Sequence, residues 1–245
     1  MSMGLLDLPA PLFYWIDGAS SGAVPATLRL WIWGVVGGVA SMGLYWLLSP
    51  QKRISATKRE LAEAQRALNS FDGEFSEAAP MMRRMLGLAF KQVGIVVIPA
   101  VIAMAPVLCL LAWMSTAYGY SWPAPGATVE TRTHPEQGYS AQWASVPGSD
   151  NAAHVLITDE SGSTLEDHAM DKAVPVLHKR AWWNALIGNP AGYLPEDLAV
   201  DAVEIELPEK HYLGFGPGWL RGWEFSFILA VTIGALGLKL GFRIE

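Results

Sequence analysis

The stretch SPQKRISATKRELAEAQRAL, Ser49–Leu68, is a charged segment with helical spacing that lies between two of the most apolar runs in the chain. Ile54, Leu61 and Leu68 recur at every seventh position, which is the repeat of a narrow coiled-coil seam. Ala64 supplies an intermediate position of the same seam. A basic helical arm placed directly after an apolar run indicates a membrane protein with a structured connector between two spans.

A second helical arm follows the sequence NSFDGEF, in which Gly73 marks the turn. Phe75, Met82 and Ala89 are again seven residues apart. Two heptad arms joined by a tight turn predict an antiparallel coiled-coil hairpin over residues 50–91. Arms of roughly 15–18 residues are marginal on their own in water. We therefore expect the hairpin to be mobile, or to be held by lipid or by a partner.

The chain is strongly apolar, with 51% hydrophobic residues, 16% charged residues and eleven Trp. Residues 30–50 and 93–118 contain no charged residue. Each run exceeds the roughly 20 apolar residues that cross a bilayer. Residues 225–238 form a shorter run that needs Lys239 at the interface, and a buried core helix is the alternative there. We predict transmembrane helices over residues 25–49, 92–118 and 214–242.

Charge is divided unevenly along the chain, whose formal net charge is −6. Residues 51–92 contain eight Lys and Arg against five Asp and Glu, whereas residues 119–221 contain six against fourteen. Short basic connectors stay on the cytoplasmic side of a membrane. We therefore predict a multi-pass protein with its N-terminus outside and a cytoplasmic tail at residues 243–245. The single cysteine, Cys109, excludes an intrachain disulfide.

The first 24 residues are predicted to lie in the membrane interface. The sequence MSMGLLDLPAPLFYWIDG lacks the basic start of a signal peptide and carries Asp7 and Asp17. It is otherwise apolar and aromatic, which suits a segment that lies on the membrane rather than across it. The aromatic run Phe13–Trp15 is expected at headgroup depth.

Residues 119–213 have a different composition, with Gly, Pro, Ser and charged residues between alternating apolar positions. Short strands are expected at ATVETRT, YSAQWASV, HVLITDE, AVPVLH and VDAVEIELP. A hairpin turn is expected at DESGS, and one or two helical turns at AWWNALIG. The predicted fold is therefore a mainly α membrane protein: three transmembrane helices with a cytoplasmic antiparallel helical hairpin, plus a small extracytoplasmic β-rich, sandwich-like domain.

No strong catalytic or metal motif is visible in the sequence. Asp167, His168 and Asp171 in EDHAMD are close together and could hold a metal, but an exposed polar hairpin arm is the more ordinary interpretation. The GFGPG sequence at residues 214–218 is interpreted as a turn, because it contains proline and follows no clear strand. We expect no enzymatic activity, no metal and no cofactor.

Polar residues inside the spans are the candidates for a groove that receives substrate, because such residues are costly in lipid and tend to be functional. For Arg29, the alternative is a side chain that reaches the outer interface. For Ser41 and Thr232, the alternative is a hydrogen bond to their own helix backbone. Gln92 marks the cytoplasmic mouth of the second span.

Small residues and prolines in the spans predict packing and bending. Gly34 and Gly38 form a small-xxx-small pair, which is typical of a helix-packing face in lipid. Pro99 and Pro106 predict a kink in the second span, where the freed carbonyls need partners from neighbouring groups or water. A polar cavity beside the kink and a bent packing element are both compatible with this pattern.

The layout of residues 5–114 resembles the core of the Oxa/YidC insertase superfamily. The resemblance is carried by LLSPQKRISATKRELAEAQRAL (47–68) followed by MMRRMLGLAFKQVGIVVIPAVIAMAPVLCLLAW (81–113). It is closest to the three-span archaeal and endoplasmic-reticulum branch. A β domain between the second and third spans is not part of that three-span pattern, and the family's groove arginine lies deeper in its span than Arg29.

The resemblance implies a factor that helps hydrophobic segments enter the bilayer through a wet groove, without a cofactor, in the inner (plasma) membrane. Its partners would be the lipid bilayer, hydrophobic client proteins or other membrane subunits, and the ribosome, but not DNA. The residues that would contact clients or the ribosome are Arg53, Lys58, Arg59, Met81, Met82, Arg83, Arg84 and Met85.

Two other functions fit the same features. A positive-inside anchor explains the charges of the hairpin equally well. The chain could then be a non-catalytic structural or accessory subunit of a larger membrane complex, with the hairpin and the β domain as docking surfaces. Alternatively, it could be a transmembrane sensor that relays a signal from the β domain to the hairpin.

Overall fold

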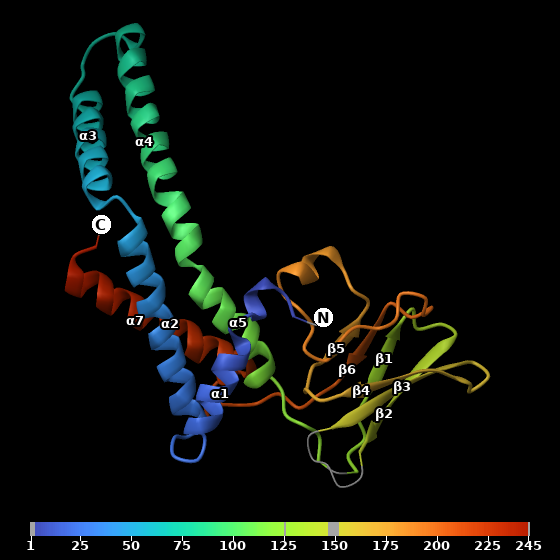
Figure 1. Cartoon of the computed structure of the whole chain (residues 1–245). Helices are drawn as coiled ribbons and strands as arrows, with labels where there is room; N and C mark the ends of the chain where they lie inside the picture. The colour runs from blue at the N-terminus through green and yellow to red at the C-terminus, as the bar shows by residue number, and fades with distance from the viewer. Residues whose placement is uncertain (1–2, 125, 147–151, 245) are drawn as a thin grey trace. The chain divides into compact units, whose positions relative to one another are not determined.

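The computed structural model describes residues 3–124, 126–146 and 152–244 (Figure 1). The helices are η1 (Leu5–Asp7), α1 (Ala10–Ser20), α2 (Ala26–Leu48), α3 (Gln51–Asn69), α4 (Phe75–Ala103), α5 (Ala105–Ala117), η2 (Trp182–Ala185), α6 (Gly218–Arg221) and α7 (Trp223–Phe242). The strands are β1 (Thr131–His134), β2 (Tyr139–Ser145), β3 (Ala153–Asp159), β4 (Thr164–Met170), β5 (Val176–His178) and β6 (Ala202–Ile205).

The chain divides into two compact units. The sheet unit comprises Met1–Trp31 and Leu108–Phe227, and so contains the N-terminal segment, most of α5 and all strands. The helical unit comprises Ile32–Val107 and Ile228–Glu245, and so contains most of α2, the α3–α4 hairpin and most of α7.

Within the described residues, three stretches of helix are long and apolar enough to cross a membrane: Ala26–Leu48, Phe75–Ala117 and Trp223–Phe242. They identify a multi-pass membrane protein, as the sequence predicts. The third begins later than the expected residue 214, because Gly222 adopts an extended conformation that separates the short helix α6 from α7.

The helix α4 forms the second arm of the hairpin and continues without interruption through residues 91–92, where the sequence predicts the hairpin to end and the second span to begin. The helical run is interrupted only at Met104, between α4 and α5. The cause is Pro106, which has no N–H to donate to the carbonyl of Ile102 and whose ring crowds the preceding turn. Pro99 lies inside α4 and does not end it.

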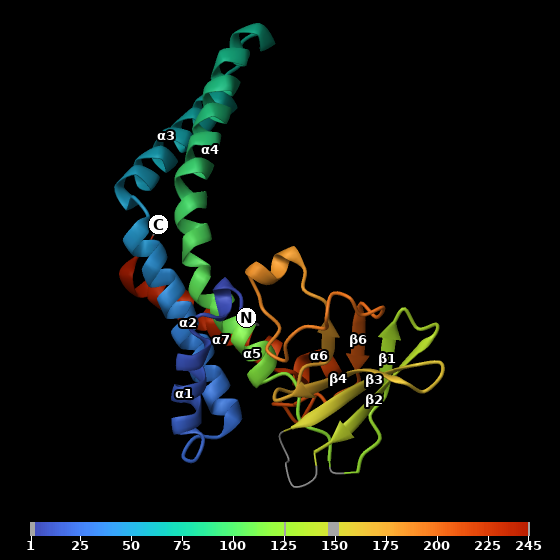
Figure 2. The same cartoon turned by 45° about the vertical axis from the view of Figure 1, so that its right-hand side comes forward.

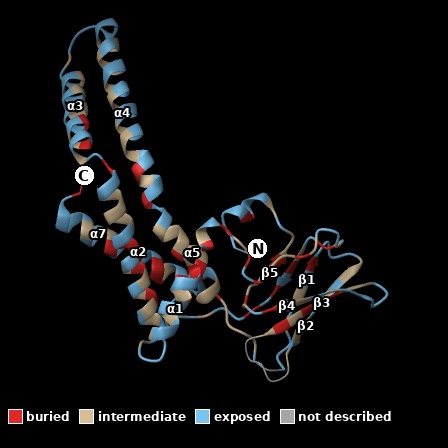
Figure 3. Cartoon of the chain, viewed as in Figure 1, coloured by how far each residue is buried: buried red, intermediate tan, exposed pale blue. Residues whose placement is uncertain are grey.

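The hairpin arms α3 and α4 pack along part of the expected seam. Ile54 is buried, with 1% of its surface exposed, and Leu61 and Met82 are half-buried. The expected seam position of Phe75 is wrong, because its side chain is 76% exposed at the first residue of α4. The ring of Phe71 in the linker lies against the turn instead. Figure 3 shows that both arms are exposed over much of their surface.

The strands form two antiparallel three-stranded sheets, with strand orders β1-β6-β5 and β2-β3-β4. Alternating apolar positions point from both sheets into one core, as β3 shows with Val155 and Ile157 and β6 with Val203 and Ile205. Leu177 of β5 is fully buried in the same core. The five expected strands correspond to β1, β2, β3, β5 and β6, and β4 is the polar hairpin arm expected at EDHAMD after the DESGS turn.

Candidate functional site

The arms α3 and α4 enclose a groove of about 630 Å³ in the helical unit, here called the α3–α4 groove. It lies where α3 begins and beside residues 91–99 of α4, close to the predicted boundary between the hairpin and the second span. The lining residues are Pro50, Arg53, Ala56, Thr57, Glu60, Lys91, Gly94, Ile95, Ile98 and Pro99.

The two walls of the α3–α4 groove differ in polarity. Arg53, Thr57 and Glu60 fall on one face of α3, because helix positions three and four apart lie above one another. The α4 wall is apolar except for Lys91 at the rim, and it carries Ile95 and Ile98. A groove with one polar and one apolar wall can hold a hydrophobic segment while groups beside that segment keep polar contacts.

The α3–α4 groove has an unobstructed wall at Gly94 and an exposed ion pair at its rim. A side chain added at Gly94 would meet no heavy atom within 4 Å, so the α4 wall is free of obstruction there. At the rim, Lys91 Nζ lies 3.9 Å from Glu60 Oε2, and both side chains are about half exposed (56% and 49%). Exposed pairs of this kind contribute little to stability, so they can separate readily.

The residues predicted to contact clients or the ribosome fall into two groups that differ in exposure, the cations and the methionines. The side chains of Arg53, Lys58, Arg59, Arg83 and Arg84 are exposed. Only Arg53 of this group lines the α3–α4 groove. The methionines Met81, Met82 and Met85 are half-buried, so part of their surface is already used by the protein.

The four predicted groove residues do not come together through any contact described for them. Ser41 Oγ donates to the Ala103 carbonyl at 2.5 Å, which supplies a partner from α2 at the break between α4 and α5. Thr232 Oγ1 bonds to the Ile228 carbonyl of its own helix at 2.8 Å. Gln92 Oε1 is buried and makes no hydrogen bond within the described chain.

The small residues of α2 lie at a close contact with α7 in the helical unit. A Cβ atom on Gly38 would overlap the Val231 carbonyl oxygen, and one on Gly234 would overlap the backbone of Val35. Gly34 is buried one turn earlier on α2. The packing interpretation of Gly38 therefore fits the structure, and Gly234 is a second close-approach position that the sequence analysis did not identify.

Arg29 lies in the sheet unit, where its charge faces Asp17 of α1. Arg29 Nε is 3.2 Å from Asp17 Oδ1, and the two side chains are only 14% and 15% exposed. The Tyr118 hydroxyl donates to the same carboxylate oxygen at 2.5 Å, and the Tyr212 hydroxyl donates to the Tyr118 carbonyl at 3.0 Å. These contacts hold α1, α2, the end of α5 and the segment before α6 together.

Burial around this cluster shifts the pKa of its outer members. Burial raises the pKa of Tyr212 well above its ordinary value, and the neighbouring Tyr118 adds to the shift. Burial lowers the pKa of Lys210, an effect that Asp17 partly opposes. Lys210 Nζ donates to the Ala117 carbonyl at 2.9 Å, so it occupies the end of α5.

Asp17 and Tyr118 are not predicted from the sequence as neighbours of Arg29, and neither are Lys210 and Tyr212 as outer members of the cluster. One signal was available for Asp17, since this acid lies in an apolar N-terminal segment and Arg29 is the only charge in the first span. Two isolated opposite charges at the same end of a span favour pairing.

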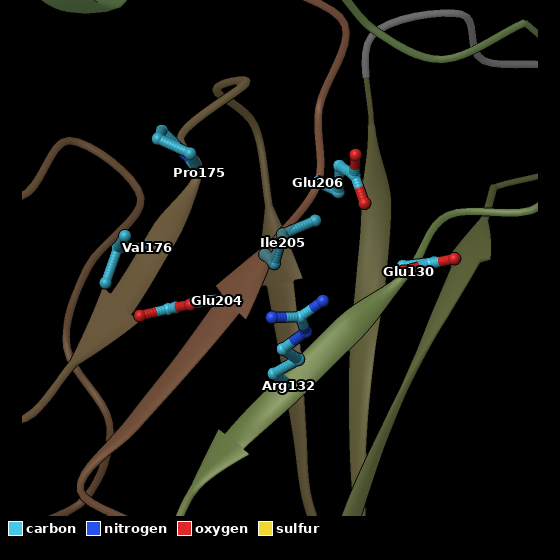
Figure 4. A pocket seen from close by; sticks show the side chains of 7 residues that line it. All are labelled: Glu130, Arg132, Pro175, Val176, Glu204, Ile205 and Glu206. Carbon is cyan, nitrogen blue, oxygen red and sulfur yellow. The ribbon is translucent and has the colours of Figure 1, made fainter.

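A second groove, of about 380 Å³, lies on the exposed face of the β1-β6-β5 sheet. Figure 4 shows Arg132 of β1 standing between Glu204 of β6 and Glu130. Glu204 also lies 3.1 Å from His134 Nε2. The face is acidic and open, and its one arginine has carboxylates on either side.

The EDHAMD segment forms part of β4, and its polar side chains separate. Asp167 pairs with His154 of β3 at 2.6 Å, whereas His168 Nε2 contacts the Ala191 carbonyl at 2.7 Å. Adjacent strand residues point to opposite faces, which explains the separation. Among the described residues, no group of three or more His, Cys, Asp or Glu could hold a metal ion.

No protein-family model matches the chain, and neither the curated proteins nor the solved structures contain a match. The resemblance to the Oxa/YidC superfamily thus rests on the sequence pattern of residues 5–114 alone.

Proposed function

We propose that this protein is an insertion or assembly factor for membrane proteins, and that the α3–α4 groove receives the hydrophobic segment of a client. The single observation that carries the proposal is the two-sided lining of that groove. Its apolar α4 wall contains Ile95 and Ile98, and its polar α3 wall contains Arg53, Thr57 and Glu60.

The physical reason lies in the cost of moving polar groups into lipid. A charged residue at the centre of a span costs about 2.5–3.5 kcal/mol on insertion scales. A segment held between Ile98 and Arg53 would bury its apolar side while its polar flank kept a charged neighbour. Ser41, which bonds to the Ala103 carbonyl, supplies a polar contact deeper in the same unit.

The charge pattern supports placing the α3–α4 groove on the cytoplasmic side, at the inner end of the second span. The hairpin arms carry exposed cations on both helices. These cations would face anionic lipid or nucleic acid near the membrane, since each Lys or Arg near an anionic surface contributes about 1 kcal/mol. The β-rich part of residues 119–213 would then be extracytoplasmic.

The test is an insertion assay with the full chain reconstituted in liposomes. The client is a single-span protein with a short N-terminal tail, and the readout is the fraction of tails protected from added protease. Gly94→Leu places a side chain in the α3–α4 groove. Gly87→Leu is the matched control, because it is also on α4, also has nothing within 4 Å of its Cβ position, and does not line the groove.

We expect Gly94→Leu to lower protection several-fold and Gly87→Leu to leave it unchanged. Both substitutions raise helix propensity by a similar amount of about 0.8–1 kcal/mol, so their difference isolates filling of the groove. The proposal would be refuted if both variants gave equal protection. It would also be refuted if the wild-type protein gave no more protection than liposomes without it.

A structural or accessory subunit is the second candidate, and one observation favours it. Phe75 at the tip of the hairpin is 76% exposed, which suits an anchor for a protein partner better than a solvated turn. Phe75→Ser should abolish co-purification of a fixed partner if the hairpin tip is a docking surface. It should leave client insertion unchanged if the α3–α4 groove carries the function.

A further inference from the structure

We propose that the loop Ala181–Gly188, which carries η2, inserts into the lipid leaflet that contacts the N-terminal segment and so anchors the β-rich part to the bilayer. This surface is independent of the α3–α4 groove and lies entirely within the sheet unit.

The loop presents an apolar surface that nothing in the described chain covers. Trp182 is 85% exposed, Leu186 50%, Ile187 43% and Trp183 42%. Residues 181–190 contain no charged side chain. Exposed apolar clusters of this kind are rare on water-facing surfaces and mark sites of contact with membranes or proteins.

The Asn184 side chain of the loop is hydrogen-bonded within the loop itself, which lowers its cost of entering lipid. Asn184 is only 1% exposed. Its Oδ1 accepts the Ala181 N–H at 2.7 Å, and its Nδ2 donates to the Ile187 carbonyl at 3.0 Å. The loop thus directs its one polar side chain inward and its apolar side chains outward, the reverse of a hydrated loop.

The loop is tied to the N-terminal segment by backbone and carboxylate contacts. The Leu6 N–H donates to the Leu186 carbonyl at 2.9 Å. The Asp7 carboxylate accepts the N–H groups of Gly188 at 2.7 Å and of Gly4 at 2.9 Å. Figures 1 and 2 both show η2 beside the N-terminal segment, so the two enter or leave lipid together.

The N-terminal segment is itself placed beside a membrane-spanning helix. The rings of Phe13 and Tyr14 lie 5.5 and 5.8 Å from the ring of Trp113, which belongs to α5 within the candidate span. On the other side of this segment, Leu8 is 65% exposed and Trp15 is 70% exposed. Apolar side chains at this level face lipid, and the tie to Leu6 and Asp7 brings the η2 loop to the same level.

The residues beside the loop suit a lipid headgroup region. Arg180 is exposed immediately before the loop, and Lys172 Nζ lies 5.0 Å from the ring centre of Tyr14. Tryptophan is enriched at membrane interfaces, and cations next to it attract anionic headgroups. Binding of a protein partner would not require both the inward hydrogen bonds of Asn184 and the attachment of the loop to the N-terminal segment. Lipid is therefore the better-supported occupant.

The test uses the full chain in liposomes whose acyl chains carry bromine, a short-range quencher of fluorescence. A bimane label is placed at Leu186→Cys or at Trp182→Cys in a Cys109→Ser background. Leu12→Cys on α1 is the lipid-facing reference, because Leu12 is 55% exposed in the N-terminal segment. Leu165→Cys on β4, where Leu165 is 41% exposed, is the water-facing control.

We expect brominated lipid to quench both loop labels to at least half the extent seen at Leu12→Cys, with little quenching at Leu165→Cys. Aqueous iodide should show the opposite order. Loop labels that behave like Leu165→Cys would overturn the proposal. Loop labels shielded from both quenchers would also overturn it and assign the surface to a protein partner.

Discussion

Replacing Asp17 by Asn is expected to destabilise the sheet unit, because it leaves the Arg29 guanidinium without its carboxylate. Arg29 Nε lies 3.2 Å from Asp17 Oδ1, and the side chains are 14% and 15% exposed. The asparagine keeps the size of the side chain and can still accept a hydrogen bond from Tyr118. The substitution therefore removes the charge and little else.

The magnitude follows from how far the pair is buried. Removing one partner of a fully buried ion pair costs about 3–5 kcal/mol. Exposed pairs contribute about 0–1 kcal/mol. With roughly one-seventh of each side chain exposed, we expect a loss of about 2–3 kcal/mol for Asp17→Asn. For a chain of this size each kcal/mol shifts Tm by about 2–4 °C, so the expected fall is roughly 4–12 °C.

The assay is thermal unfolding of the full chain in detergent, followed by tryptophan fluorescence, for Asp17→Asn, Arg29→Met and the double variant. The double variant should lose at least about 1 kcal/mol less than the sum of the singles, because it leaves no uncompensated charge. Asp72→Asn, at an exposed acid in the hairpin linker, is the control. Additive losses of less than about 0.5 kcal/mol for each single variant would refute the reasoning.

Three further outcomes are expected. Gly38→Ala should lower Tm by an amount that corresponds to about 1–3 kcal/mol of overpacking against α7. Gly237→Ala, with nothing within 4 Å of its Cβ position, should leave Tm unchanged. Equal effects of the two substitutions would contradict the close contact at Gly38. Ser41→Ala should cost about 0.6–1.7 kcal/mol in the same assay, because the carbonyl at the α4–α5 break loses its donor, and an unchanged Tm would exclude that role. Burial raises the pKa of Tyr14 from 10.0 to about 12, so its contribution to stability is present below pH 10 and is lost as the pH rises towards 12. The difference in absorbance at high pH between the wild type and Tyr14→Phe should have its midpoint near the higher value, and a midpoint near 10 would contradict the burial of this phenol.

The hairpin and the spans are predictable from the sequence because their signals are local. The heptad of Ile54 and Leu61 lies within one helix, and each apolar run fills most of one span. The heptad prediction fails at Phe75, the first residue of α4. A seven-residue repeat within one arm does not determine where the other arm ends. The break at Met104 is likewise local, since Pro106 removes a backbone donor within one turn.

The Arg29 cluster is not predictable in the same way, because its members are distant in the sequence. Tyr118 lies 101 residues from Asp17. The approach of these groups depends on how α1 folds back beside α5, which no periodicity encodes. The isolated charges of Asp17 and Arg29 indicate that each needs a partner, but the tyrosines give no sequence signal.

The strand β4 shows a different limit, because the DESGS turn indicates it more clearly than its own residues do. Its sequence TLEDHAM has few apolar residues, and only Met170 at its end is buried. The strand exists because it pairs with β3, whose Val155 lies opposite His168. Pairing with a strongly apolar neighbour can thus form a strand that the residues alone do not favour.

The central proposal is that the α3–α4 groove receives hydrophobic segments. It is tested most directly by photo-crosslinking from p-benzoylphenylalanine placed at Ala56, which lines the groove, in native membranes during protein synthesis. Gln65, exposed on the same helix outside the groove, is the control position. We predict crosslinks from Ala56 to many different newly made membrane proteins, captured only while these are being synthesised, and few from Gln65. A single stable partner at Ala56, or identical patterns at the two positions, would contradict an insertion factor.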